Sequence, residues 1–125
     1  MAIEIAARWD RMTMHEVAAQ FAAKCQGSRG NVGYLSESYF GGPYPTEMLA
    51  PEAFRYGRAR IAAANLKKRL PDALYEIETR ELGFSYNAEG ERNARRLQKE
   101  FREFVALCAH KEEETGIPCL IVTSL

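Results

Sequence analysis

The feature that most constrains this chain is a long segment of helical periodicity towards its C-terminal end. Between Asn87 and Gly116 the sequence reads "NAEGERNARRLQKEFREFVALCAHKEEETG". Apolar residues of the kind found in protein cores recur there every three or four positions, which places their side chains on one face of a helix. They are Leu97, Phe101, Phe104, Val105 and Cys108. Asn87 can cap the start, and Gly116 followed by Pro118 favours an end. We therefore predict a long helix with one buried face.

Two segments that flank this helix have the patterns of strands. The C-terminal run "IPCLIVTSL" is apolar and rich in β-branched residues, which favours a strand buried on both faces. In residues 74–80, Tyr75 and Ile77 alternate with Glu76 and Glu78, which is typical of a half-exposed strand. A strand, a helix and a strand in succession predict a right-handed parallel crossover.

The N-terminal third predicts a strand followed by a helix. Alternating apolar residues over positions 3–7 favour a short strand. Thr13 and Glu16 have the spacing of a capping box, in which each side chain accepts from the other residue's backbone N–H. Val17 and Phe21 then fall at helical spacing, so we expect them on the buried face of this helix.

The stretch from Gly27 to Ala50 is the least regular part of the chain, with five glycines and two prolines. A strand or short helical turn is expected inside it, over residues 32–40, and Gly27 suits the end of the preceding helix. Pro51 favours the start of a second helix that runs to Leu70 and stops before Pro71. Its alanine-rich stripe fits a homodimer as readily as a core.

These elements together predict the fold class. We expect an α+β protein in which three main helices pack on a small mixed β-sheet, in the order β-α-loop-α-β-α-β. Residues 1–125 are interpreted as a single compact domain, because neither a repeat nor a linker interrupts the sequence.

Composition excludes several classes of protein. The hydrophobic fraction of 46% and the charged fraction of 27% are those of an ordinary globular protein. The sequence has neither an apolar run long enough to span a bilayer nor a leader pattern, so we expect a cytoplasmic protein without membrane contact. Seventeen basic residues balance seventeen acidic ones, which leaves no net field to attract nucleic acid. Three unpatterned cysteines indicate reduced thiols.

The residues that could carry catalysis or hold a metal are poorly spaced for it. No cysteine or histidine pair has the short spacing of a zinc site, so we expect neither metal nor cofactor. Cys25 and His15 are about 15 Å apart along one helix, too far for a nucleophile and its base. A small hydrolase or nuclease that uses Cys25, or the strand carboxylates Glu76 and Glu78, remains an alternative, but we favour a protein without catalysis.

The first alternative to protein binding, ahead of a hydrolase or nuclease, is nucleic-acid binding. The "GSRG" stretch, residues 27–30, resembles the backbone-clamping loop of KH-type modules over four residues. Gly33 then departs from that pattern, and we interpret the stretch as a helix exit. Three arginines would lie within about a quarter of the circumference of the predicted second helix, and a fourth lies in the glycine-rich loop. The candidate phosphate contacts are Arg29, Arg55, Arg58 and Arg69.

The aromatic residues around the glycine-rich loop give the leading hypothesis. Six of them fall within 23 positions: Tyr34, Tyr39, Phe40, Tyr44, Phe54 and Tyr56. Tyrosine beside glycine and serine is typical of protein-binding surfaces. We therefore expect a small accessory, regulatory or inhibitor-like protein whose loop from Gly30 to Pro45 recognises a protein partner, with the first four aromatics as contacts. The alternative is a loop pinned over the core by its own rings.

Overall fold

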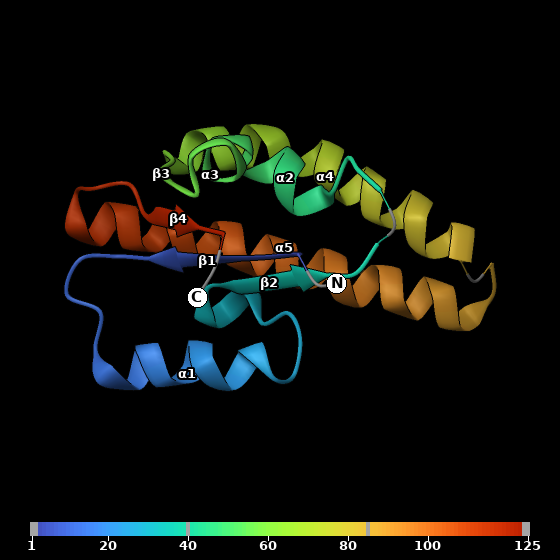
Figure 1. Ribbon diagram of the computed structural model, residues 1–125, viewed down its shortest axis with the longest axis horizontal. Coiled ribbons are helices and arrows are strands. Elements are labelled where there is room, and N and C mark those ends of the chain that lie inside the picture. The colour runs from blue at the N-terminus through green and yellow to red at the C-terminus, as the bar shows by residue number, and fades with distance from the viewer. Residues whose placement is uncertain (1–2, 40, 85, 124–125) are drawn as a thin grey trace.

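The computed structural model of the protein describes residues 3–39, 41–84 and 86–123 and confirms an α+β fold (Figure 1). Helices and short strands alternate irregularly along the chain. Their order is β1 (Ile3–Arg8), α1 (Met14–Lys24), the 3₁₀ helix η1 (Gly30–Val32), β2 (Tyr34–Glu37), α2 (Pro45–Leu49), α3 (Pro51–Tyr56), β3 (Arg58–Arg60), α4 (Ala63–Phe84), α5 (Ala88–Thr115) and β4 (Leu120–Val122).

The described strands form one sheet in the order β2-β1-β4-β3, and each neighbouring pair is antiparallel. Alternation along the strands gives the sheet two faces. The inner face, which includes Ile5, Leu35 and Ile121, belongs to the main hydrophobic core with Phe101 and Phe104 of α5. The outer face carries the alternate residues of the same register: Glu4, Ala6, Arg8, Tyr34, Ser36, Arg58, Arg60, Leu120 and Val122.

The long helix α5 is confirmed with the ends that the sequence predicted. Asn87 caps it by accepting a hydrogen bond from the Gly90 backbone N–H at 3.0 Å, and Gly116 follows it with a left-handed φ of 77°. All five apolar residues of the predicted stripe are buried. In Figure 1, α5 runs along the sheet beside α4. None of the described helices is both long and apolar enough to cross a bilayer.

The helix predicted from Pro51 to Leu70 is wrong, because the chain breaks at Gly57. Gly57 has a left-handed φ of 80° and ends α3 after Tyr56. The chain then forms the edge strand β3, and the backbone and hydroxyl of Thr123 both donate to the Gly57 carbonyl at 3.0 Å. A short helix and a strand therefore replace the first half of the predicted helix.

The strand predicted over residues 74–80, and with it the parallel crossover, is also wrong. These residues lie inside α4, which continues through Pro71. Leu66, Ala73 and Ile77 are fully buried on one side of this helix, while Pro71 is exposed. The proline removes one backbone hydrogen bond, but buried residues of the main hydrophobic core continue on both sides of it. Burial of this stripe therefore outweighs the local signal to stop.

Helix α1 is capped as expected but faces the sheet with a different side. The Thr13–Glu16 capping box is present, at 2.8 and 3.1 Å. The buried residues of the helix are Gln20 and Ala23, so the buried stripe predicted from Val17 and Phe21 is wrong. The Gln20 amide donates to the carbonyls of Ala7 at 2.7 Å and Val32 at 3.0 Å, and these bonds determine which side of α1 faces inward.

The two glycines of the "GSRG" stretch have separate structural roles. Gly27 has a φ of 103° and lies just beyond α1, where the predicted helix exit is confirmed. Gly30 begins η1 and is buried directly against α5, where its N–H donates to Oε1 of Glu100 at 2.8 Å. A β-carbon on Gly30 would lie only 1.8 Å from the Glu100 carbonyl oxygen. This position therefore requires glycine because two backbones meet there.

Gly30→Ala should lower the free energy of unfolding by about 3 kcal/mol or more, because backbone must move to relieve the overlap with α5. Gly83→Ala is the matched control, since Gly83 is in α4 with open space around it. We expect the control to be neutral or to gain about 0.5 kcal/mol from reduced backbone entropy. Urea denaturation of both variants measures the difference, and equal stabilities would contradict the close approach.

Candidate functional site

The aromatic loop places two of its four predicted contact residues inside the protein. Tyr34 and Tyr39 are 2% and 9% exposed. The Tyr34 hydroxyl donates to Oε2 of Glu4 at 2.6 Å, and the Tyr39 hydroxyl donates to Oε1 of Glu81 at 2.8 Å. Burial raises the pKa of Tyr34 to about 12. These two rings hold the segment against the core. This agrees with the alternative interpretation, in which the loop is attached to the core by its own aromatic rings.

The other two predicted contact residues, Tyr44 and Phe40, are not shown to lie in the core. Tyr44 is half-buried and immediately precedes α2, while Phe40 lies outside the described residues. The Arg80 guanidinium lies 5.2 Å from the centre of the Tyr39 ring and donates to the Gly41 carbonyl at 2.9 Å. The loop is thus attached to α4 by a cation–π contact and a hydrogen bond.

Tyr39→Ala should lower the free energy of unfolding by about 3 kcal/mol, because it removes a buried ring and its hydrogen bond to Glu81. Tyr44→Ala serves as the control in the same loop and should cost clearly less, since this side chain is only half-buried. Thermal or urea denaturation distinguishes them. A fully stable Tyr39→Ala variant would mean that the ring is not part of the core.

A buried carboxyl group, Glu37, lies where the loop leaves β2. Its Oε1 accepts from the Thr46 N–H at 2.8 Å and from the Thr46 hydroxyl at 2.5 Å, at the start of α2. Its Oε2 is buried, with no hydrogen-bond partner among the described residues. Burial raises the pKa of Glu37 to about 7, although the Thr46 bonds and the charge of Arg80 lower it.

Perturbed carboxyl groups are common in active sites, but the geometry of Glu37 gives it a structural role. Glu37 lines a surface depression of about 320 Å³, together with Tyr39, Glu81, Arg96 and other residues. The unpartnered Oε2 of Glu37 is itself buried, and its Oε1 is engaged by the two Thr46 bonds. Its function in the fold is to hold the N-terminal turn of α2 against β2.

Glu37 should make stability fall as pH rises from about 5 to 8. The pKa in the unfolded chain is near 4.5 and in the folded protein about 7. The folded state therefore keeps a proton that the unfolded chain releases, which makes the contribution full below pH 4.5 and lost above pH 7. The difference is about 3 kcal/mol at most.

Glu37→Gln tests this, because glutamine can accept the Thr46 bonds but does not titrate. Urea denaturation between pH 5 and 8.5 should show a smaller loss of stability in the variant than in the wild type. All other titratable groups are the same in both proteins, so the difference between the two curves isolates Glu37. Parallel curves would assign the pH dependence to other groups.

The four arginines proposed for phosphate binding are not on one helical face. Arg69 forms a bidentate ion pair with Glu52, at 2.7 and 2.8 Å. Arg55 is exposed beside the Tyr56 ring and lines a depression of about 660 Å³ together with Arg69. Arg58 belongs to the edge strand β3, and Arg29 precedes η1 next to β2, at the opposite edge of the sheet. The structure thus brings together Arg55 and Arg69, and Glu52 neutralises Arg69.

The residues proposed for catalysis are likewise apart or already paired. Glu76 and Glu78 lie on α4 and pair with Arg80 and Arg95, at 2.8 and 2.7 Å. Cys25 is exposed at the end of α1. The remaining two thiols, Cys108 and Cys119, are buried next to each other, and the contact together with burial raises the pKa of Cys108. Within the described parts of the chain, no group of three or more acidic, histidine or cysteine side chains could hold a metal.

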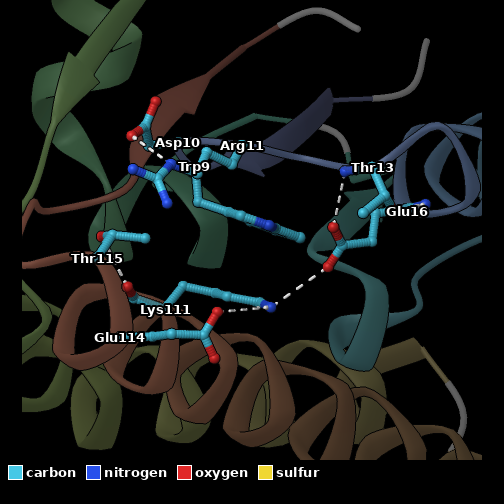
Figure 2. Close-up of a pocket in the computed structure, with 8 residues that line it drawn as sticks. All are labelled: Trp9, Asp10, Arg11, Thr13, Glu16, Lys111, Glu114 and Thr115. Carbon is cyan, nitrogen blue, oxygen red and sulfur yellow. Dashed lines mark hydrogen bonds and ion pairs between the residues drawn. The ribbon is translucent and has the colours of Figure 1, made fainter.

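A polar pocket of about 390 Å³ lies where the β1–α1 turn meets the end of α5 (Figure 2). Lys111 extends across it, with Nζ 5.1 Å from the centre of the Trp9 ring, 3.3 Å from Glu16 and 3.6 Å from Glu114. The Thr13 N–H and then Lys111 lower the pKa of Glu16. Because the lysine is paired twice, this pocket offers polar contacts rather than a free cation.

The pocket is bordered by a turn in a strained conformation. Arg11 has a φ of 64°, a left-handed value that costs a residue with a β-carbon about 1 kcal/mol. Its side chain is exposed and contacts only Asp10, at 4.0 Å, among the ion pairs of the described residues. The turn directs the chain from β1 into α1, so that the first residues of α1 line one side of the pocket.

The most exposed apolar side chains of the described residues include a stripe on α1 next to this pocket. Met14, Val17 and Phe21 are 87%, 39% and 53% exposed, and their spacing places them on one side of the helix. We call these three residues the α1 stripe. The periodicity was visible in the sequence, but which face turns inward depends on the Gln20 hydrogen bonds, which no local pattern indicates.

Comparison with known proteins adds no functional information. No family model matches the chain, and neither a curated protein nor a solved structure shows significant similarity to it.

Proposed function

We propose that this chain is a small non-catalytic binding protein, regulatory or inhibitor-like, that recognises a protein partner through the α1 stripe. The observation that carries the proposal is the exposure of Met14, Val17 and Phe21 on one side of a well-anchored helix. Large apolar side chains gathered on one surface are typical of interaction sites, whereas single exposed ones are common everywhere.

The attachment of α1 supports this role, because it fixes the position of the stripe. Gln20 and Ala23 hold the helix from the opposite side. The capping box orders its first turn, and Lys24 pairs with Glu4 at 3.6 Å at its last turn. A helix held at both ends presents its free side with little loss of conformational entropy on binding.

The surroundings of the stripe also fit an interface. Protein-binding surfaces combine an apolar centre, enriched in methionine and aromatic residues, with a polar rim. Here Met14 and Phe21 supply the centre, and the polar pocket of Figure 2, which shares Thr13 and Glu16 with the start of α1, supplies one side of the rim. The proposal keeps the function expected from the sequence but moves it from the aromatic loop, because Tyr34 and Tyr39 are engaged inside the protein.

The proposal is tested with Val17→Glu/Phe21→Glu in tagged protein purified from its native cells. The fold should be unchanged, since exposed positions usually alter stability by less than about 0.5 kcal/mol. Proteins that co-purify with the wild type should be lost from this variant. Tyr75→Glu is the matched control, because Tyr75 is 71% exposed on α4, away from the stripe.

The control should retain the partners of the wild type. Equal retention by the double variant would rule out the stripe, and equal loss in both variants would indicate nonspecific adhesion. Sedimentation of purified protein should be run in parallel. A dimer that the double variant abolishes would identify a second copy of the chain as the partner.

A further inference from the structure

The outer face of the sheet concentrates three arginines that are far apart in the sequence. Arg8 of β1 and Arg60 of β3 both pair in register with Leu120 of β4, and Arg58 pairs with Val122. Partners across antiparallel strands lie on the same face. Adjacent strands are about 4.8 Å apart and residues two apart on one strand are about 6.6 Å apart, so the Cα atoms of the three arginines lie within about 12 Å of each other.

These arginines lack the carboxylate partners that other arginines of the protein have. Arg69, Arg80 and Arg95 each pair with a glutamate, whereas no ion pair among the described residues involves Arg8, Arg58 or Arg60. All three are exposed. The Arg60 guanidinium donates to the Pro118 carbonyl at 2.9 Å, which holds this cation in place and leaves its other N–H groups available.

The acidic residue on the same face is already engaged elsewhere. Glu4 pairs with Lys24 at 3.6 Å and accepts from the Tyr34 hydroxyl, towards the β2 edge of the sheet. The strand order places β3 at the opposite edge. A protein with no net charge therefore carries a local positive surface. Among the described residues of this sheet face, no acidic one lies beside the arginines to repel an anionic ligand.

An aromatic ring borders the arginines. A shallow depression of about 330 Å³ is lined by Arg8, Tyr56, Gly57, Arg58 and Val122. The Arg55 guanidinium lies 6.0 Å from the centre of the Tyr56 ring, but Tyr56 is 68% exposed, so the ring remains accessible. The Thr123 bonds to the Gly57 carbonyl fix the turn that joins Tyr56 to Arg58. The ring and the guanidinium groups are thus presented side by side on an ordered backbone.

We propose that this surface, formed by Arg8, Tyr56, Arg58 and Arg60, binds single-stranded nucleic acid. Arginines contact the phosphates of the backbone, and Tyr56 stacks on an unpaired base. The exposed ring favours a single strand over an acidic peptide, because stacking uses the flat face that every base has. It also favours a single strand over a duplex, whose bases are stacked on each other. The surface is separate from the α1 stripe, so either proposal can fail without the other.

Fluorescence anisotropy with a labelled oligothymidylate of about twelve nucleotides tests the proposal at low salt. The wild type should bind, and the logarithm of its association constant should fall with the logarithm of salt concentration with a slope of about −2, as three phosphate contacts predict. Arg58→Glu should weaken binding at least tenfold. Arg92→Glu is the matched control, since Arg92 is exposed near the start of α5, and it should bind nearly as the wild type does.

Tyr56→Leu separates stacking from charge. This variant should weaken binding about tenfold while the salt slope stays the same, and Arg8→Gln should reduce the slope by about 0.7. Circular dichroism checks that each variant is folded, and Arg8→Gln replaces Arg58→Glu if the latter is not.

Several results would overturn the proposal. These are absence of binding by the wild type at 50 mM salt, an equal loss in Arg92→Glu and Arg58→Glu, and an unchanged affinity in Tyr56→Leu. Unlabelled duplex of the same sequence and polyglutamate should compete poorly. If polyglutamate competes as well as the oligonucleotide, the surface recognises acidic protein, and the nucleic-acid proposal is wrong.

Discussion

The burial of one face of α5 is the interaction on which the rest of the structure depends. Phe101 and Phe104 are fully buried between the inner face of the sheet and the neighbouring helices. Helix α4 packs along α5, and η1 approaches it so closely that Gly30 can carry no side chain. Each fully buried large apolar side chain is worth roughly 1.5–3 kcal/mol. The sheet strands are only three to six residues long, so they rely on this helix for their packing.

The parts of the fold that could be predicted from the sequence are those specified locally. The capping box at Thr13, the Asn87 cap and the Gly116 stop each depend on residues within one or two helical turns. The strands β1, β2 and β4 fall in segments where strands were expected. In contrast, Pro71 and the alternation over 74–80 are local signals that packing overrides: the stripe of Leu66, Ala73 and Ile77 stays in contact with the main hydrophobic core on both sides of the proline. Without that contact there was no reason to expect a helix through these residues.

The surfaces were harder to predict than the elements, because they depend on direction and register. Val17 and Phe21 were recognised as one helical stripe, but the side chain of Gln20, which turns that stripe outward, makes its bonds to distant carbonyls. Arg58 was singled out from the sequence, whereas Arg8 and Arg60 join it only through the pairing of β1, β4 and β3. The aromatic loop attracted attention for its composition, and its tyrosine hydroxyl groups proved to have partners more than 25 residues away.

The way α1 is attached gives the protein two levels of cooperativity. Its apolar contact with the sheet is a small cluster of Ala6, Ala23, Tyr34 and Val122, separate from the main core. Its polar contacts include hydrogen bonds from one amide and ion pairs near both ends. Detaching α1 breaks no strand pairing and exposes little of the main core, so it requires less free energy than global unfolding. We therefore expect α1 to open locally while the rest of the fold stays intact, so that its amide hydrogens exchange faster than those of α5.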